Sequence, residues 1–158
     1  MKLTTRGRYA VTAMLDLSCY DTGKPIALAD ISSRQAISLS YLEQLFAKLR
    51  RSGLVRSVRG PGGGYMLNER PKEISIADII RAVDEPIKAT SCDDEEGSGC
   101  KQSTRCITHH LWADMGDHIF NYLESVNLGR LVEESRANGT VPESSPSADK
   151  KHRKKVRP

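Results

Sequence analysis

Hydrophobic residues in the first third of the chain recur with helical spacing in three successive segments. The first segment begins at Thr4 or Thr5, residue types that cap helices, and it ends near Gly23 and Pro25. Its apolar residues cover most of a helix circumference, which predicts a helix buried on most sides. They are Tyr9, Val11, Ala13, Met14, Leu15 and Leu17. Cys19 lies in the same apolar stretch and is predicted to be a core residue.

The second and third segments are separated by a short connection and together predict a helix-turn-helix. A short helix is expected over residues 27–35 and a tight connection over residues 36–38. In the longer helix that follows, Ser40 and Glu43 fit a capping box, and Gly53 stands where a C-terminal cap belongs. One apolar stripe runs along this third helix and consists of Leu42, Leu45, Phe46 and Leu49.

Two short apolar segments around a glycine-rich loop predict a β-hairpin. Residues 54–58 lead into the loop at residues 60–64, and residues 65–67 lead out of it. A nucleotide-binding phosphate loop is not expected, because no Gly-Lys-Ser/Thr follows and a strand stands where a helix is required. A hairpin after a helix-turn-helix is a wing. We therefore predict a mainly α fold that contains a winged helix-turn-helix domain with a β-hairpin wing.

Beyond the wing, hydrophobic spacing predicts two further helices. Ser75 and Asp78 open a short helix with one apolar face, which stops at residues 84–86. A long helix is predicted from Thr104 to Val126, and apolar residues recur along it at steps of three and four. This seam consists of Trp112, Met115, Ile119, Tyr122 and Val126. We expect it to pair with a second copy in a homodimer, and the alternative is packing within its own subunit.

The chain thus divides into three expected regions. Residues 1–72 form the winged helix-turn-helix domain, predicted to bind DNA, and residues 73–132 hold the short helix, a cysteine-rich loop and the long dimerisation helix. From about Ala137 the composition changes to Gly, Ser, Pro and charge, so residues 133–158 are predicted to form a disordered basic tail.

The formal charge of +4 conceals an asymmetry along the chain. Residues 1–72 carry 12 Lys and Arg against 5 Asp and Glu, a net +7, whereas residues 73–140 carry 6 against 13, a net −7. Residues 141–158 carry 6 against 2, a net +4. A basic first half favours a polyanionic partner, and with a winged helix-turn-helix that partner is expected to be double-stranded DNA.

The exposed face of the third helix and the wing carry side chains that suit a DNA groove. Gln pairs with adenine, Glu accepts from cytosine N4, and the first residues of such a helix reach base edges. On the wing, Arg59 is expected to meet phosphates or the minor groove. The candidate DNA-binding residues are Ser38, Ser40, Tyr41, Glu43, Gln44, Arg59 and Gly60. Taken alone, the helix face is equally consistent with an ordinary solvated surface.

No segment approaches the roughly 18 unbroken apolar residues of a membrane span, and the first residues lack the apolar stretch of a signal peptide. We therefore expect a cytoplasmic protein without a membrane partner. Thiols stay reduced in that compartment, so clustered cysteines indicate metal or redox chemistry sooner than disulfides. No nucleophile and base constellation occurs, so the chain is not expected to be an enzyme.

Three of the four cysteines and a histidine follow the pattern Cys92-x7-Cys100-x5-Cys106-x2-His109. Thiolates suit zinc or iron-sulfur clusters, and an imidazole completes a set of four donors. The pattern leaves open a sensing cluster, a structural zinc site and a thiol redox switch. On a helix, Cys106 faces both His109 and His110, so spacing does not choose between the two histidines.

Three further motifs occur in order with this cysteine segment. They are Leu3-Thr4-Thr5-Arg6-Gly7-Arg8-Tyr9-Ala10, Ser38-Leu39-Ser40-Tyr41-Leu42-Glu43-Gln44-Leu45-Phe46 and Val58-Arg59-Gly60-Pro61-Gly62-Gly63-Gly64-Tyr65. Together, over about residues 1–132, the four motifs resemble the IscR family of iron-sulfur cluster regulators. The first cysteine spacing looks two residues longer than the family pattern, and the extra stretch is acidic at residues 93–96. Negative charge near a cluster is expected to lower its potential.

The resemblance implies a homodimeric bacterial transcription regulator that senses iron-sulfur clusters. It implies a 2Fe-2S cluster held by Cys92, Cys100, Cys106 and His109, with the cluster-assembly machinery as the donor. It further implies repression of the cluster-assembly operon by the cluster-bound form and control of other genes by the apo form. Cluster occupancy would then select operators, with Glu43 rejecting sites that lack a matching donor.

Overall fold

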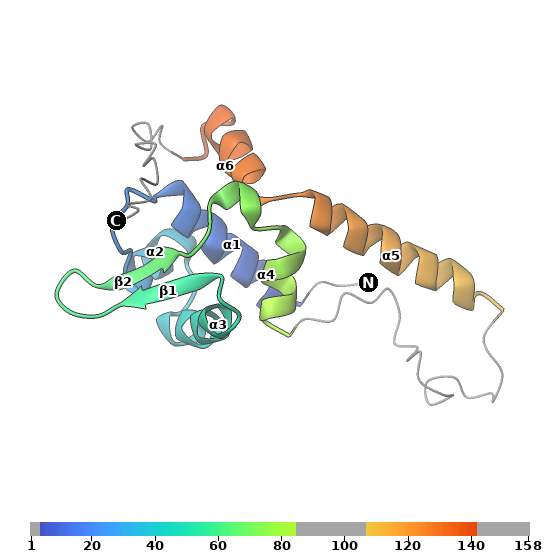
Figure 1. Cartoon of the computed structure of the whole chain (residues 1–158), viewed down its shortest axis with the longest axis horizontal. Coiled ribbons are helices and arrows are strands. Elements are labelled where there is room, and N and C mark those ends of the chain that lie inside the picture. The colour runs from blue at the N-terminus through green and yellow to red at the C-terminus, as the bar shows by residue number, and fades with distance from the viewer. Residues whose placement is uncertain (1–3, 85–106, 142–158) are drawn as a thin grey trace, which may run out of the picture.

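The computed structural model describes residues 4–84 and 107–141, and its regular elements within these ranges are helices and one two-stranded sheet (Figure 1). The elements in chain order are α1 (Thr5–Cys19), α2 (Leu28–Gln35), α3 (Leu39–Arg51), β1 (Val55–Val58), β2 (Gly64–Leu67), the 3-10 helix η1 (Pro71–Glu73), α4 (Ile76–Ala82), α5 (His109–Ser125) and α6 (Leu128–Ala137). The mainly α class and the winged helix-turn-helix are confirmed. No helix in the described ranges combines the length and hydropathy that a membrane span requires.

Helix α1 lies at the centre of the molecule and packs against α2, α3, α4, α6 and β2 (Figure 1). Its buried positions include Ala10, Ala13 and Met14, whose mostly small side chains let neighbouring helices approach closely. Cys19, the last residue of the helix, is buried as predicted. Tyr9 is not a core residue, because 36% of its surface is exposed.

A buried carboxylate joins α1 to α2. The side chain of Asp16 is inaccessible to solvent and accepts hydrogen bonds from Arg34 Nη2 at 2.6 Å and from Gln35 Nε2 at 2.7 Å. The guanidinium of Arg34 also lies 4.1 Å from the centre of the Tyr20 ring. Because an unpaired buried carboxylate is strongly unfavourable, this network holds α2 at one position on α1. The spacing of apolar residues did not indicate this network.

The helix-turn-helix connection differs from its prediction at the start of α3. Ser38, and not Ser40, is the N-cap, since the Ser38 side chain accepts a hydrogen bond from the backbone N–H three residues later. Ala36 adopts a left-handed conformation with φ 53°, and the next side chain, Ile37, is buried. These two residues fix where the helix begins. Because Ser38 provides the capping acceptor, the predicted capping box of Ser40 and Glu43 is wrong.

The apolar stripe and the C-terminal cap of α3 are confirmed. All four stripe residues are buried, namely Leu42, Leu45, Phe46 and Leu49. Gly53 follows the helix with φ 84°, and the Leu54 N–H donates to the Leu49 carbonyl at 3.0 Å. This is the Schellman arrangement, in which a glycine in the left-handed region ends a helix and the last carbonyls find donors.

The wing is the antiparallel pair β1–β2, as predicted, with Val55 opposite Leu67 and Val58 opposite Gly64. The hairpin is also joined to the segment before α2, because Ile26 and Tyr65 exchange backbone hydrogen bonds of 3.0 and 2.8 Å. A β-carbon on Gly64 would collide with the Ile26 carbonyl, so only glycine permits this close approach. The wing is therefore held against the body of the domain.

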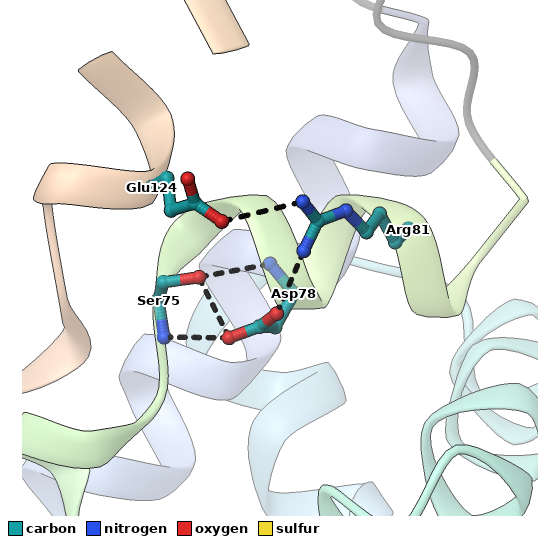
Figure 2. A network of polar contacts seen from close by, with 4 residues as sticks. All are labelled: Ser75, Asp78, Arg81 and Glu124. Carbon is teal, nitrogen blue, oxygen red and sulfur yellow. Dashed lines mark hydrogen bonds and ion pairs between the residues drawn. The ribbon is translucent and has the colours of Figure 1, made fainter. Parts of the chain in front are cut away.

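Helix α4 begins with the predicted capping box. The Asp78 N–H donates to Ser75 Oγ at 3.1 Å, and the Ser75 N–H donates to Asp78 Oδ2 at 3.3 Å (Figure 2). Buried residues of α4 and of the chain on either side of it share one hydrophobic core with α1 and α3: they are Ile74, Ile76, Ile79, Ile80 and Val83. The core thus continues across the domain boundary expected after residue 72.

Helix α5 begins at His109 and is shorter than the helix predicted from Thr104, because Ile107 and Thr108 form a turn. No residue of α5 is buried, and in Figure 1 the helix extends away from the rest of the molecule. Val126 follows the helix in an extended conformation, is 5% exposed and belongs to the core of its own subunit. It is therefore not part of the exposed seam in which the sequence placed it.

Helix α6 was not predicted, and it occupies residues assigned to the tail. The Asn127 side chain caps it by accepting from the Arg130 N–H at 2.9 Å, and Leu128 is fully buried. The helix packs on α1 and η1 and continues to Ala137, so residues 133–137 are helical. The later part of the predicted tail, residues 142–158, lies outside the described residues.

Candidate nucleic-acid interface

The polar face of α3 points away from the core. Burial of the leucine and phenylalanine stripe leaves Ser40, Glu43 and Gln44 exposed on the opposite side of the helix, with the N-cap Ser38 exposed just before them. Their exposure agrees with the predicted arrangement of a reading helix, in which the first turns carry the residues that reach base edges.

Tyr41 extends this surface onto α1. Its ring is half-buried and meets the ring of Tyr9 edge to face, with the ring centres 5.9 Å apart. Tyr9 was assigned to the core because α1 is apolar on most sides, and the sequence contains no signal that separates it from the buried residues. The exposed position beside Tyr41 makes Tyr9 a further candidate for the interface.

The wing presents Arg59 and Gly60 at its tip. Both are exposed, and Gly60 adopts φ 104°, a conformation that favours glycine. The wing is connected to α3 by a hydrogen bond of 3.2 Å from Arg50 Nη1 to Ser57 Oγ. The Tyr65 ring also packs on Phe46 with a centre-to-centre distance of 4.9 Å. These contacts fix the position of the wing relative to α3.

The last turn of α3 is basic and meets the end of α4. It contains Lys48, Arg50 and Arg51, and Lys48 Nζ lies 2.8 Å from Asp84 Oδ2. Asp84 is the last described residue before the segment that contains Cys92. An ion pair therefore joins α3 to the chain that leads into the predicted ligand segment.

The predicted metal ligands are only partly within the structure. Cys92, Cys100 and Cys106 lie outside the described residues, so their arrangement stays a prediction. His109 is the first residue of α5, is half-exposed, and has its ring centre 5.7 Å from that of His110. The described helix starts at His109, so the helical spacing predicted between Cys106 and the two histidines is not part of it. The described residues hold no cluster of three or more His, Cys, Asp or Glu able to bind a metal.

The remaining cysteine does not belong to this ligand set. Cys19 is a free, buried thiol, and burial raises its pKa, which is only partly opposed by the positive charge of Arg136. A thiol with a raised pKa is a poor ligand and nucleophile at neutral pH. Its assignment to the core is confirmed.

Arg81 connects α4 to α5 (Figure 2). Its Nη1 lies 3.1 Å from Asp78 Oδ1 and its Nη2 lies 3.3 Å from Glu124 Oε1, so one guanidinium joins a carboxylate of α4 to one of α5. The same guanidinium lies 4.3 Å from the centre of the Phe120 ring. These contacts hold the C-terminal half of α5 on α4, and nothing in the local sequence pattern indicated them.

Comparison with known proteins identifies the family. The model of the Rrf2 family, described as iron-dependent transcriptional regulators, matches residues 3–134. The chain belongs to the Rrf2 family. Like the other members that it resembles, this Rrf2 protein is a DNA-binding transcription regulator.

Curated relatives that carry the name HTH-type transcriptional regulator IscR match most of this chain. The protein of Aliivibrio salmonicida is 57% identical over 132 residues, which cover 84% of this chain and 77% of the relative. That of Photorhabdus laumondii is 56% identical over the same length, with 84% and 79% covered. The resemblance to IscR inferred from the four motifs is confirmed.

Solved structures share the fold over most of the chain. IscR of T. potens matches with a TM-score of 0.71 and 34% identity, covering 92% of this chain and 93% of that one. CymR, the global cysteine regulator of B. subtilis, matches with a TM-score of 0.70 and 34% identity, covering 85% and 98%. Because regulators with different names share the fold equally well, the Rrf2 fold by itself does not identify the signal that is sensed.

Proposed function

We propose that this Rrf2 regulator senses iron-sulfur cluster status and that occupancy of a 2Fe-2S cluster selects which operators it binds. The observation that carries this proposal is the position of α4. The cysteine segment starts at the end of this helix, which packs on α1 and α3, and the ion pair of Lys48 with Asp84 lies at that junction. A change in the segment therefore begins beside the helix that reads DNA.

The proposed ligands are Cys92, Cys100, Cys106 and His109. Three thiolates and one imidazole are donors that iron-sulfur clusters accept, and His109 is half-exposed at the start of α5. A bound cluster supplies a site whose occupancy depends on iron and on redox conditions. The family description as iron-dependent regulators supports this ligand set over a thiol switch without iron.

On the DNA side, the exposed face of α3 is proposed to read bases through Ser38, Ser40, Tyr41, Glu43 and Gln44. Arg59 and Gly60 at the tip of the wing are proposed to contact the backbone or the minor groove. Glu43 is proposed to select among operators. A carboxylate that is buried against DNA without a hydrogen-bond donor costs binding free energy, so sites that lack a matching cytosine are rejected.

Regulation requires two copies of the chain. We infer that α5 forms the homodimer contact along Trp112, Met115, Ile119 and Tyr122, because their side chains leave apolar surface uncovered in the single subunit. A dimer presents two winged domains to the two halves of a palindromic site. The cluster-bound dimer then represses the cluster-assembly operon, the apo form controls other genes, and the cluster-assembly machinery supplies the cluster.

Anaerobic purification with a visible spectrum and assays of iron and sulfide tests this function. The expected result is a coloured protein, and Cys92→Ala, Cys100→Ala or Cys106→Ala should each lose the chromophore, whereas Cys19→Ala should keep it. His109→Ala should weaken the chromophore and His110→Ala should leave it nearly unchanged. Full iron content in one of the loop variants would remove that residue from the ligand set.

A thiol redox switch is the second candidate, and one comparison favours it. CymR of Staphylococcus aureus, whose structure is known in an oxidized form, is 36% identical and matches with a TM-score of 0.67 over 84% of this chain and 97% of that one. A switch of this kind predicts a colourless protein whose thiols pair on oxidation. A structural zinc site predicts a colourless protein that retains zinc.

A further inference from the structure

The carboxylate of Asp84 occupies the basic end of the reading helix. It lies 2.8 Å from Lys48 Nζ, and Lys48 stands in the last turn of α3 beside Arg50 and Arg51. The two partners are 36 positions apart in sequence, so the contact depends on the packing of α4 against α3 and not on local structure.

The surroundings of Asp84 are cationic. The hydrogen bond from Lys48, followed by the positive charges of Lys48, Arg6 and Arg51, lowers the pKa of Asp84 below its ordinary value. Arg6 comes from the first turn of α1, and Lys48 and Arg51 come from the last turn of α3, so two elements bring positive charge to one carboxylate. Such a cluster of cations at the edge of a DNA-reading helix has the chemistry of a phosphate site.

The backbone holds Asp84 in place while its side chain stays in solvent. Its φ is 54°, its N–H donates to the Arg81 carbonyl at 3.0 Å, and the preceding Val83 is fully buried. Asp is among the few residues besides glycine that tolerate this left-handed conformation. Because both partners of the pair are partly exposed, the ion pair adds little to folding stability. An effect of Asp84 on DNA binding is therefore separable from an effect on folding.

We propose that Asp84 is an internal competitor for DNA: its carboxylate holds the Lys48 ammonium that otherwise contacts a backbone phosphate. This inference rests on the proposed use of the α3 face for DNA. A DNA phosphate must displace the carboxylate to reach Lys48, so the position of Asp84 sets affinity without touching a base. Cys92 follows only eight positions later, which places this competitor at the start of the proposed ligand segment.

The test measures binding of full-length protein to a mixed-sequence DNA duplex of about three helical turns across a series of salt concentrations. Asp84→Asn removes the charge and keeps a residue that tolerates the left-handed backbone. It should tighten binding several-fold and steepen the plot of log affinity against log salt by about 0.9, the value for one added phosphate contact. Lys48→Gln should weaken binding, and Asp84→Asn should have no further effect when added to Lys48→Gln.

The matched control is Glu133→Gln. It removes one negative charge from another exposed ion pair, that of Lys72 with Glu133 at 3.1 Å on η1 and α6. If it tightens binding as much as Asp84→Asn, net charge alone is responsible and the inference is overturned. Unchanged affinity and salt slope in Asp84→Asn, with wild-type protein binding the duplex normally, would overturn the inference and leave the proposed function standing. Absence of duplex binding by the wild type even at the lowest salt concentration would overturn both, because phosphate contacts alone should suffice for binding there.

Discussion

Helices α3 and α5 are both amphipathic, and their apolar faces have opposite surroundings. Every residue of the α3 stripe is buried by the same chain, whereas α5 has no buried residue and leaves Trp112 39% and Tyr122 61% exposed. The spacing of apolar residues predicted both faces equally well. The spacing did not specify which surface covers each apolar face, because that depends on packing between segments distant in sequence.

The largest effect is expected when the buried stripe of α3 is broken. Phe46→Ala removes a fully buried ring that contacts Tyr65 of the wing, so it should destabilise the fold by about 3–5 kcal/mol. Leu111→Ala on α5 alters an exposed side chain and should change stability by no more than about 0.5 kcal/mol. Urea unfolding measures both values. Equal losses would show that α5 is as tightly packed as α3.

The proposed pairing of α5 is tested by placing a charge on its seam. Ile119→Glu buries an unpaired carboxylate between helices if two copies pair there, and it should weaken association by several kcal/mol. Sedimentation should then show monomers, and DNA affinity should fall because the two half-sites are no longer bound together. The control is Asn121→Glu, at an exposed position outside the seam. A dimer that survives Ile119→Glu would place the contact elsewhere.

A smaller effect is expected from the cap that fixes the start of α3. Ser38→Ala removes the side-chain acceptor of the first turn and should cost about 1 kcal/mol of stability. Ser40→Ala leaves that hydrogen bond intact and should be nearly neutral. Thermal unfolding of the two variants compares them directly. The reverse order would restore Ser40 as the cap and shift the start of the helix.

The smallest effect on stability, and the most selective effect on DNA, is expected at Glu43. Its side chain is exposed, so Glu43→Ala should leave unfolding unchanged. It should broaden site choice, so that cluster-free protein binds operators otherwise reserved for the cluster-bound form. The measurement compares both forms at one salt concentration, on duplexes selected from a random pool with each form. Uniform weakening at every site would exclude Glu43 as the selector.

Local signals in the sequence were sufficient for α1 to α4 and for the wing. Gly53 was found because helices end on glycine, and Ser75 with Asp78 because a capping box is a short-range pattern. The capping-box rule failed at Ser40, where the sequence contains a Ser-x-x-Glu pattern. The left-handed conformation of Ala36 has no signal in the sequence, so the true start of the helix was missed. Local rules thus locate elements well but place their first residues less reliably.

Features that depend on distant contacts were not predictable. Helix α6 is short and is placed by backbone bonds to the chain before α4, and Asp16 is buried only because Arg34 reaches it from α2. Arg81 reaches Glu124 across 43 positions. Of the candidate site, the polar face of α3 and the wing tip followed from pattern, whereas Tyr9 and Asp84 required the three-dimensional arrangement. The three cysteines lie outside the described residues, so their convergence stays a prediction.

Backbone hydrogen bonds join the chain after α5 to the chain around the start of α4. The Ile76 N–H donates to the Val126 carbonyl at 2.9 Å, and the Leu128 N–H donates to the Ile74 carbonyl at 3.0 Å. The chain that follows α5 thus returns to the core beside the start of α4. Asp84 and Val126 therefore stand at opposite ends of the one short helix α4, so the fold fixes the two points between which the predicted ligand segment runs. That topology is compatible with one scaffold serving regulators as differently named as IscR and CymR.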